Sequence, residues 1–175
     1  MFVYLDNSAT TKSYKKVIEV MLRYMETDYG NPSSLHRMGL DAEKAIKEAR
    51  KIVAASMGAK DEEIYFTSGG TEADNIALFG TAYARKRKGN KIITSQIEHP
   101  AILESCKNLV DMGFKVEYLP VDHNGIIDVS ALNDALDDQS ILITVMQINN
   151  ELGSIQPIAE IAEMKRNAEK KIKTE

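Results

Sequence analysis

The stretch Ile64-Tyr65-Phe66-Thr67-Ser68-Gly69-Gly70-Thr71-Glu72-Ala73-Asp74-Asn75 runs from a short apolar segment, through a small polar turn, into a long amphipathic segment. This pattern predicts a strand over 64–66 and a helix over 72–87. The paired glycines let the backbone approach a ligand closely, and the new helix points free N–H groups and the positive end of its dipole at the turn. Such a turn suits a phosphate, although capping and turn formation alone would also explain its residues. Its spacing matches neither a P-loop nor a dinucleotide-binding fingerprint.

The rest of the chain surrounds this turn with alternating elements. Residues 1–12 are expected to form an extended polar arm. Helices are predicted over about 14–27, 41–57, 72–87, 100–111, 129–137 and 158–170, and strands over about 64–66, 91–95, 115–119 and 141–148. Strands that alternate with helices predict an α/β fold with a mostly parallel sheet flanked by helices.

Two parts are expected, an N-terminal arm with helices over 1–60 and the first part of a larger sheet domain over 61–175. No strand follows the last helix. Either that helix is a terminal cap, or the chain stops in the middle of a domain. We favour the second alternative, because crossover helices usually lead back to the sheet.

Composition narrows the class of protein. The 175 residues suffice for a real core, and 43% hydrophobic with 27% charged residues is typical of a soluble globular protein. A net charge of −4 argues against nucleic-acid binding, which requires clustered Lys and Arg. A single cysteine excludes a disulfide framework. The N-terminus lacks a signal-peptide pattern and no apolar run could span a membrane, so a cytoplasmic location is expected.

Polar residues follow three of the predicted strands. Ser68-Gly69-Gly70-Thr71 follows the first, Gln96-Ile97-Glu98-His99-Pro100 the second, and Asn149-Asn150-Glu151 the last. Because ligands of open α/β sheets bind beyond the carboxyl ends of the strands, these groups are expected at one edge. An imidazole there could stack on a flat ring or relay a proton, and carboxamides could hold a polar ligand. The alternatives are a helix-initiating His99 and an ordinary turn at Asn149-Asn150-Glu151.

Other reactive side chains carry less information. Cys106 lies on the apolar face of a predicted helix, so a buried structural role is favoured over a nucleophilic one. No group of His, Asp and Glu has the spacing of a metal site.

Five segments, in family order across the chain, resemble the N-terminal portion of a NifS/IscS-type cysteine desulfurase of the class V aminotransferase group. They are Tyr4-Leu5-Asp6-Asn7-Ser8-Ala9-Thr10-Thr11, Gly30-Asn31-Pro32-Ser33-Ser34 with His36, Phe66-Thr67-Ser68-Gly69-Gly70-Thr71-Glu72, Ile97-Glu98-His99, and Asn149-Asn150-Glu151-Leu152-Gly153. The resemblance implies the first part of the large domain of a fold type I transferase that depends on pyridoxal 5′-phosphate. It also implies sulfur transfer from L-cysteine, giving L-alanine and an enzyme persulfide for iron–sulfur or thio-cofactor assembly.

By matching position, Gly70 and Thr71 resemble the residues that hold the cofactor's phosphate. His99 resembles the imidazole that stacks on the pyridine ring and shuttles protons, which makes it the catalytic candidate. Asn150 resembles the amide donor near the phenolic oxygen and the substrate carboxylate. The resemblance further implies a homodimer and a sulfur-acceptor or iron–sulfur scaffold partner for the intact enzyme.

The chain departs from the family at three catalytic groups. The family's Schiff-base lysine, its aspartate at the pyridine nitrogen and its persulfide-forming cysteine all come later, and Cys106 does not match the catalytic position. The 175-residue chain alone is therefore predicted to lack desulfurase activity. A selenocysteine lyase, another class V enzyme, or a non-catalytic dimerising or partner-binding fragment are the remaining alternatives.

Overall fold

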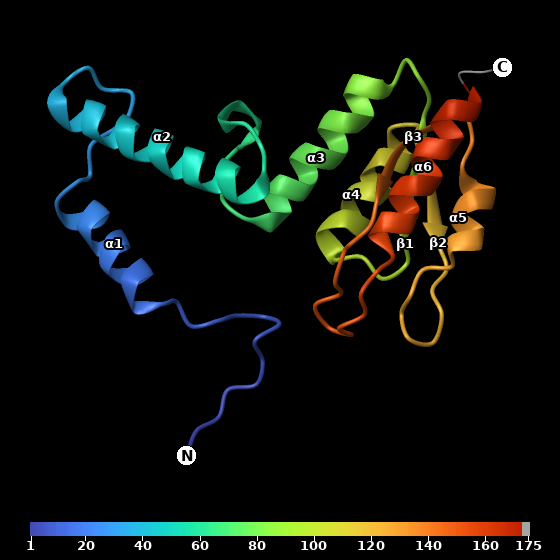
Figure 1. Cartoon of the computed structure of the whole chain (residues 1–175), viewed down its shortest axis with the longest axis horizontal. Coiled ribbons are helices and arrows are strands. Elements are labelled where there is room, and N and C mark those ends of the chain that lie inside the picture. Colours follow the sequence, from blue (N-terminus) through green and yellow to red (C-terminus); the bar gives the residue numbers. More distant parts are fainter. Residues whose placement is uncertain (173–175) are drawn as a thin grey trace. The chain divides into compact units, whose positions relative to one another are not determined.

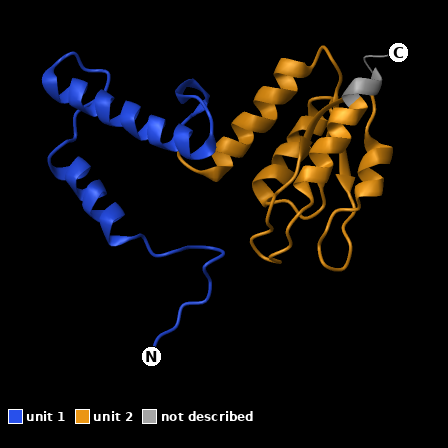
Figure 2. Ribbon diagram, viewed as in Figure 1, with its two compact units in different colours: residues 1–66 blue, residues 67–175 orange. Residues whose placement is uncertain are grey.

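The computed structural model describes residues 1–172, and the side chains of residues 1–168. Along the chain lie α1 (Lys15–Glu26), α2 (Arg37–Met57), a 3₁₀ turn η1 (Asp61–Glu63), α3 (Gly70–Arg85), β1 (Lys91–Ser95), α4 (Pro100–Asp111), β2 (Lys115–Leu119), α5 (Val129–Ala135), β3 (Ser140–Thr144) and α6 (Ile158–Ile172) (Figure 1). The chain divides into two compact units, residues 1–66 and residues 67–175 (Figure 2). The predicted division at residue 60 into an arm with helices and a cofactor-binding part stays a prediction.

The second unit is built on a parallel sheet with the strand order β2-β1-β3. In the central strand, Ile92 lies opposite Val116 on one side and Leu142 on the other. Residues 92–95 of this strand are all buried, because helices cover both faces of the sheet. The predicted α/β fold with a parallel sheet is confirmed.

Each face of the sheet has its own hydrophobic core, because successive strand residues point to opposite sides. Ile92 belongs to the core beneath α3 and α4, and Ile93 to the core beneath α5 and α6 (Figure 1). The first core contains Leu78, Ala82, Ile92, Ile102, Cys106, Leu109, Phe114 and Ile141. The second contains Ile93, Leu119, Ile127, Leu132, Ala135 and Ile161.

The strand predicted over 64–66 is wrong. These residues form no strand, since no other strand of the described chain lies beside them to complete a ladder. Their contacts are made with other residues of the first unit instead. The guanidinium of Arg50 donates to the carbonyl oxygen of Ile64 and lies 4.9 Å from the ring centre of Phe66, while the Ile64 N–H donates to Asp61.

Other predicted bounds also need correction. α3 begins and ends two residues earlier than the predicted 72–87, at Gly70 and Arg85. α2 begins at Arg37, four residues earlier than predicted, because the His36 side chain caps it by accepting from the Gly39 N–H. α5 ends at Ala135, two residues early. β3 ends at Thr144 and not at 148, since the Met146 N–H leaves the sheet to bind the Glu98 carboxylate.

The first unit contains α1, α2 and η1. As predicted, α2 ends at Met57, and the left-handed conformation of Gly58 (φ 64°) closes the helix. None of the residues of α1 is buried. An apolar groove of about 720 Å³ runs between segments of this unit, lined in part by Tyr24 and Ile46. Among the described residues, no helix is both long and apolar enough to cross a membrane.

Candidate functional site

The start of α3 offers backbone donors in an open position. Gly69 precedes the helix with extended backbone, and the Glu72 carboxylate turns back to accept from the Ser68 N–H (2.6 Å) and hydroxyl (2.7 Å). These hydrogen bonds from Ser68 lower the pKa of Glu72. Within the described part of the chain, the N–H groups of Gly70, Thr71 and Glu72 have no acceptor. A Cβ built at Gly70 would meet no atom within 4 Å, so the space beside this residue is open.

Helices α3 and α4 lie side by side and parallel, which sets the position of these donors. Near the start of the helices, the Ser105 Oγ of α4 lies 2.6 Å from the Asn75 Oδ1 of α3. Near their ends, the Tyr83 hydroxyl donates to the Met112 sulfur at 3.1 Å. The N-termini of both helices therefore lie at the same end of the unit, which is the carboxyl end of β1.

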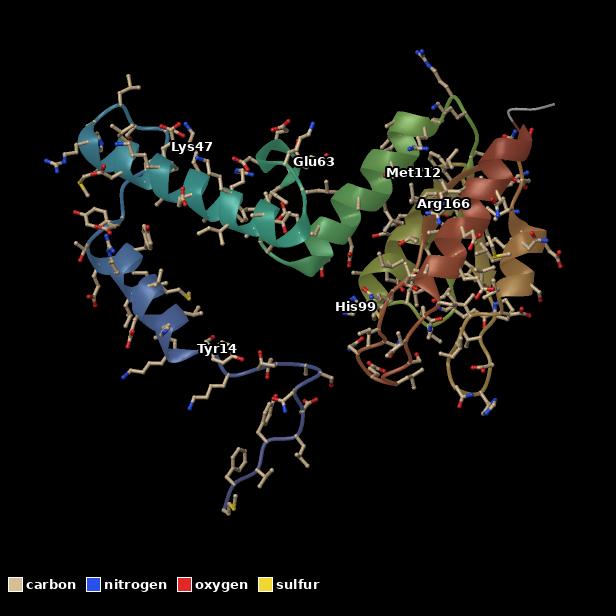
Figure 3. The ribbon with its side chains drawn as sticks, viewed as in Figure 1. Tyr14, Lys47, Glu63, His99, Met112 and Arg166 are labelled. Atoms are coloured by element: carbon tan, nitrogen blue, oxygen red, sulfur yellow. The ribbon has the colours of Figure 1, made fainter. Side chains whose placement is uncertain are left out.

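His99 occupies the position before α4, where its side chain is exposed (Figure 3). Its Nδ1 accepts from the Ala101 N–H at 3.1 Å, so the predicted helix-initiating role is confirmed. This hydrogen bond requires an unprotonated Nδ1, and the neutral ring then carries its proton on Nε2. The cap fixes the ring and leaves Nε2 and the ring faces available, so capping and ligand contact are compatible.

The two carboxamides after β3 have different roles. Asn149 is buried, and its Nδ2 donates to the Ile97 carbonyl oxygen at 2.9 Å. Its Oδ1 accepts from the N–H groups of Glu151 (2.9 Å) and Leu152 (2.8 Å). Asn150 is exposed, and its side chain makes no hydrogen bond to the described residues. The turn alternative is thus confirmed at Asn149, and a ligand contact by the exposed Asn150 stays a prediction.

Glu98 is the residue that the sequence analysis missed. Its side chain is 6% exposed. Its Oε1 accepts from the Ser95 hydroxyl (2.6 Å) and the Met146 N–H (2.9 Å), and its Oε2 from the same N–H (3.1 Å). The available signal was a charged residue three positions after the predicted strand over 91–95, although a glutamate is seldom fully buried.

Cys106 is fully buried in the core beneath α3 and α4. Burial, together with the nearby charge of Glu98, raises the pKa of its thiol to about 11. A thiol that stays protonated near neutral pH is a poor nucleophile, so the predicted structural role is confirmed. The described residues include no group of three His, Cys, Asp or Glu side chains placed to hold a metal ion.

Gly70, Thr71, His99 and Asn150 are thus all exposed, and they come from the starts of α3 and α4 and the loop after β3. The predicted strand before Gly70 is absent, so α3 reaches this end through its contact with α4. The loops after β1 and β3 meet through Glu98 and Asn149. That one ligand with an anionic group contacts these backbone donors, the imidazole and the amide together stays a prediction.

Comparison with known proteins gives close relatives. A cysteine desulfurase IscS of Methanosarcina thermophila is 52% identical over 162 residues, which cover 93% of this chain and 40% of that protein. A putative cysteine desulfurase IscS 1 of Bacillus subtilis is 49% identical over 162 residues, which cover 93% of this chain and 43% of that protein. The chain spans less than half the length of these relatives.

Solved structures agree in fold. A NifS-like protein superposes with a TM-score of 0.94 at 39% identity, over 97% of this chain and 47% of the other. A structure of SspA in complex with cysteine gives a TM-score of 0.86 at 37% identity, over 93% of this chain and 47% of the other. The aminotransferase class-V family matches residues 3–173. With almost its whole length matched, the chain belongs to the class V aminotransferases and is homologous to the IscS and NifS cysteine desulfurases.

Proposed function

We propose that this chain forms the first part of a cysteine desulfurase that depends on pyridoxal 5′-phosphate. The observation that carries the proposal is the open, unpaired start of α3, at the same end of the unit as His99. Relatives about 50% identical, which are named cysteine desulfurases, supply the reaction class.

The residues present fit the cofactor. The N–H groups of Gly70 and Thr71 at the positive end of the α3 dipole would hold its phosphate. The exposed ring of His99 would lie against the flat pyridine ring, and the amide of Asn150 would donate to the phenolic oxygen. When bound, pyridoxal 5′-phosphate supplies the electron sink for breaking bonds of an amino-acid substrate.

The chain's own residues would bind, orient and hold protons. The hydrogen bond from Ala101 keeps the Nδ1 of His99 unprotonated, so the proton that His99 can donate sits on Nε2. Asn150 can present its Nδ2 as a donor, because none of its side-chain atoms is used within the described fold. The thiol of Cys106 takes no part, since it is buried and protonated.

The full reaction needs groups that the chain does not carry at family positions, namely the cofactor lysine, the aspartate and the reactive cysteine. We therefore propose that the 175-residue chain releases no sulfide from L-cysteine by itself. In the intact enzyme, L-cysteine is the proposed substrate, a second copy the proposed partner, and a sulfur-acceptor or iron–sulfur scaffold protein the proposed recipient. Sulfide release by the purified chain with added cofactor would contradict this part of the proposal.

Selenocysteine lyase activity or another class V reaction would use the same cofactor contacts. Assays of the intact enzyme with each amino acid would separate these reactions.

A partner-binding role has one specific observation in its favour. All the apolar side chains of α1, among them Val20, Met21 and Met25, are at least partly exposed. Cross-linking of the purified chain to a second copy would support that role.

The cofactor site is tested by titrating pyridoxal 5′-phosphate into the full chain and following absorbance and quenching of tyrosine fluorescence. Gly70→Pro removes one N–H donor, and proline is tolerated in a first helical turn after an extended residue such as Gly69. Loss of a charge-assisted hydrogen bond should weaken binding about tenfold.

Gly70→Ala is the matched control, because it keeps the N–H and adds a methyl group to open space. It should change affinity by less than about threefold, within the ~0.5 kcal/mol of an ordinary surface change. Thr71→Ala and Thr81→Ala form a second pair on the same helix. Only the first should weaken binding, because it removes a hydroxyl that could donate to the phosphate at the start of α3. Equal affinity of wild type and Gly70→Pro would show that the Gly70 N–H does not hold the phosphate.

A further inference from the structure

We propose that Glu98 is a positioning residue. Together with Asn149, it locks the loop after β1 to the loop after β3, so that His99 and Asn150 are held as one rigid pair. This inference deepens the proposed function and rests on it for the ligand, but the lock itself is a property of the fold.

The first tie is the carboxylate of Glu98. It follows β1 by three residues and binds the Met146 N–H, two residues beyond β3, with both of its oxygens. The Ser95 hydroxyl donates to Oε1 as well. Because Glu98 is buried, water cannot replace a lost partner.

The second tie is made by a side chain of the other loop. The Asn149 Nδ2, after β3, donates to the carbonyl oxygen of Ile97, after β1. The same side chain holds its own turn through the N–H groups of Glu151 and Leu152. In both ties the loop after β3 donates and the loop after β1 accepts, but the side chain comes from the loop after β1 in the first tie and from the loop after β3 in the second.

The loop that carries Asn150 is closed on itself. The Asn149 N–H donates to the Ser154 carbonyl oxygen and the Gln156 N–H to that of Gln147, both at 2.9 Å. An antiparallel bridge pairs Ile148 with Ile155. The turn therefore moves as one body, and its attachment through Asn149 determines where Asn150 lies.

Each ligand candidate directly follows a buried anchor in the chain, His99 after Glu98 and Asn150 after Asn149. A shift of an anchor therefore moves its neighbour. A different physical role is general stability, because any buried and hydrogen-bonded glutamate stabilises a fold. The two roles differ in what they do to the start of α3, which the lock does not contact.

The experiment uses two probes on the full chain, pyridoxal 5′-phosphate and inorganic phosphate, at a temperature where each variant keeps its wild-type circular dichroism. Glu98→Ala should weaken pyridoxal 5′-phosphate binding about tenfold, the effect of one buried donor left unpaired. Inorganic phosphate, which needs only the start of α3, should keep its affinity within about twofold.

Ser95→Ala is the matched control, since it removes one bond to the same carboxylate but leaves both loops tied. It should bind both probes like wild type. Glu98→Gln keeps the side-chain shape if Glu98→Ala fails to fold, and its amide cannot accept with both atoms, so it should show a smaller loss in the same direction. Equal weakening of both probes would overturn the positioning role in favour of general stability.

Amide exchange measures the lock without any ligand. In Glu98→Ala the N–H groups of Glu151 and Leu152 should exchange faster although their direct partner Asn149 is unchanged. Unchanged exchange would overturn the lock. If the wild type binds neither probe, the proposed cofactor site fails, and this exchange result alone still decides whether the lock exists.

Discussion

The two units of the chain treat their apolar side chains differently. In the first unit, α1 buries none of its residues, and Met21 is 50% exposed. In the second unit, helices of comparable length cover a sheet, and Leu109 of α4 is fully buried. An amphipathic pattern predicts that a helix will be covered, but the covering surface must come from elsewhere in the structure.

The contrast also separates positions that govern stability from positions that govern binding. The second unit encloses two cores, and its exposed ligand candidates project from a well-packed base. The first unit depends on local contacts such as those of Arg50. Mutations with the same chemistry should therefore have unequal effects in the two units.

The largest effect is expected in the core of the second unit. Leu109→Ala should reduce the free energy of unfolding by about 2–5 kcal/mol, because it leaves a cavity among fully buried neighbours. Urea unfolding followed by circular dichroism measures this loss. A loss below about 1 kcal/mol, the typical loss for a point mutation at any position, would contradict the picture of a tightly packed core.

A smaller effect is expected at Arg50 in the first unit. Arg50→Ala removes both the bond to the Ile64 carbonyl oxygen and the cation–π contact with Phe66, at a combined cost of about 1–2 kcal/mol. Chymotrypsin should then cut more rapidly at Tyr65 and Phe66. Arg50→Lys keeps the charge without the planar fork and should give an intermediate rate. Unchanged cleavage in both variants would show that other contacts hold this segment.

A still smaller effect concerns pH. The Ser130 hydroxyl and the N–H groups of Ala131 and Ser130 bind the Asp128 carboxylate, and they lower its pKa from the ordinary 3.8. A lowered pKa means that this contribution to stability is present above pH 3.8 and is lost as pH falls through the folded value.

Asp128→Asn keeps the cap and should match wild type at pH 7, but it should lose less stability between pH 7 and pH 3, because asparagine does not titrate. The urea midpoint at both pH values measures the difference. Asp134→Asn, an exposed change in the same helix, should keep the wild-type loss. If Asp128→Asn and wild type lose the same stability between pH 7 and pH 3, the ionised Asp128 cap does not contribute to the pH dependence of stability.

The smallest effect is expected on α1. Met21→Ala removes a large apolar side chain that no described residue buries, so the free energy of unfolding should change by less than about 1 kcal/mol, and alanine's helix propensity offsets part of any loss. Urea unfolding alongside Leu109→Ala gives a direct comparison. A loss as large as that of Leu109→Ala would mean that α1 is covered in solution, for example by a second copy, and dilution of the protein would then lower the urea midpoint.

Local patterns predicted most of the second unit. The strands over 91–95 and 115–119 and the helix over 100–111 have the predicted bounds. Glycine and proline lie near the ends of these elements. Within each element, the spacing of the apolar residues is that of a helix or of a strand, as observed. The absence of a strand over 64–66 and the early end of β3 could not be predicted, because a strand forms only where a neighbour pairs with it.

The candidate site shows the same division. Sequence by itself determined the α/β class, the family resemblance, and the candidates Gly70, Thr71, His99 and Asn150, since these depend on local pattern and residue type. Only the tertiary structure decided that Glu98 and Asn149 are buried anchors, because their partners lie 48 and 52 residues away along the chain. Hydrogen bonds between distant loops depend on how the strands align, and neighbouring residues in the sequence do not record that alignment.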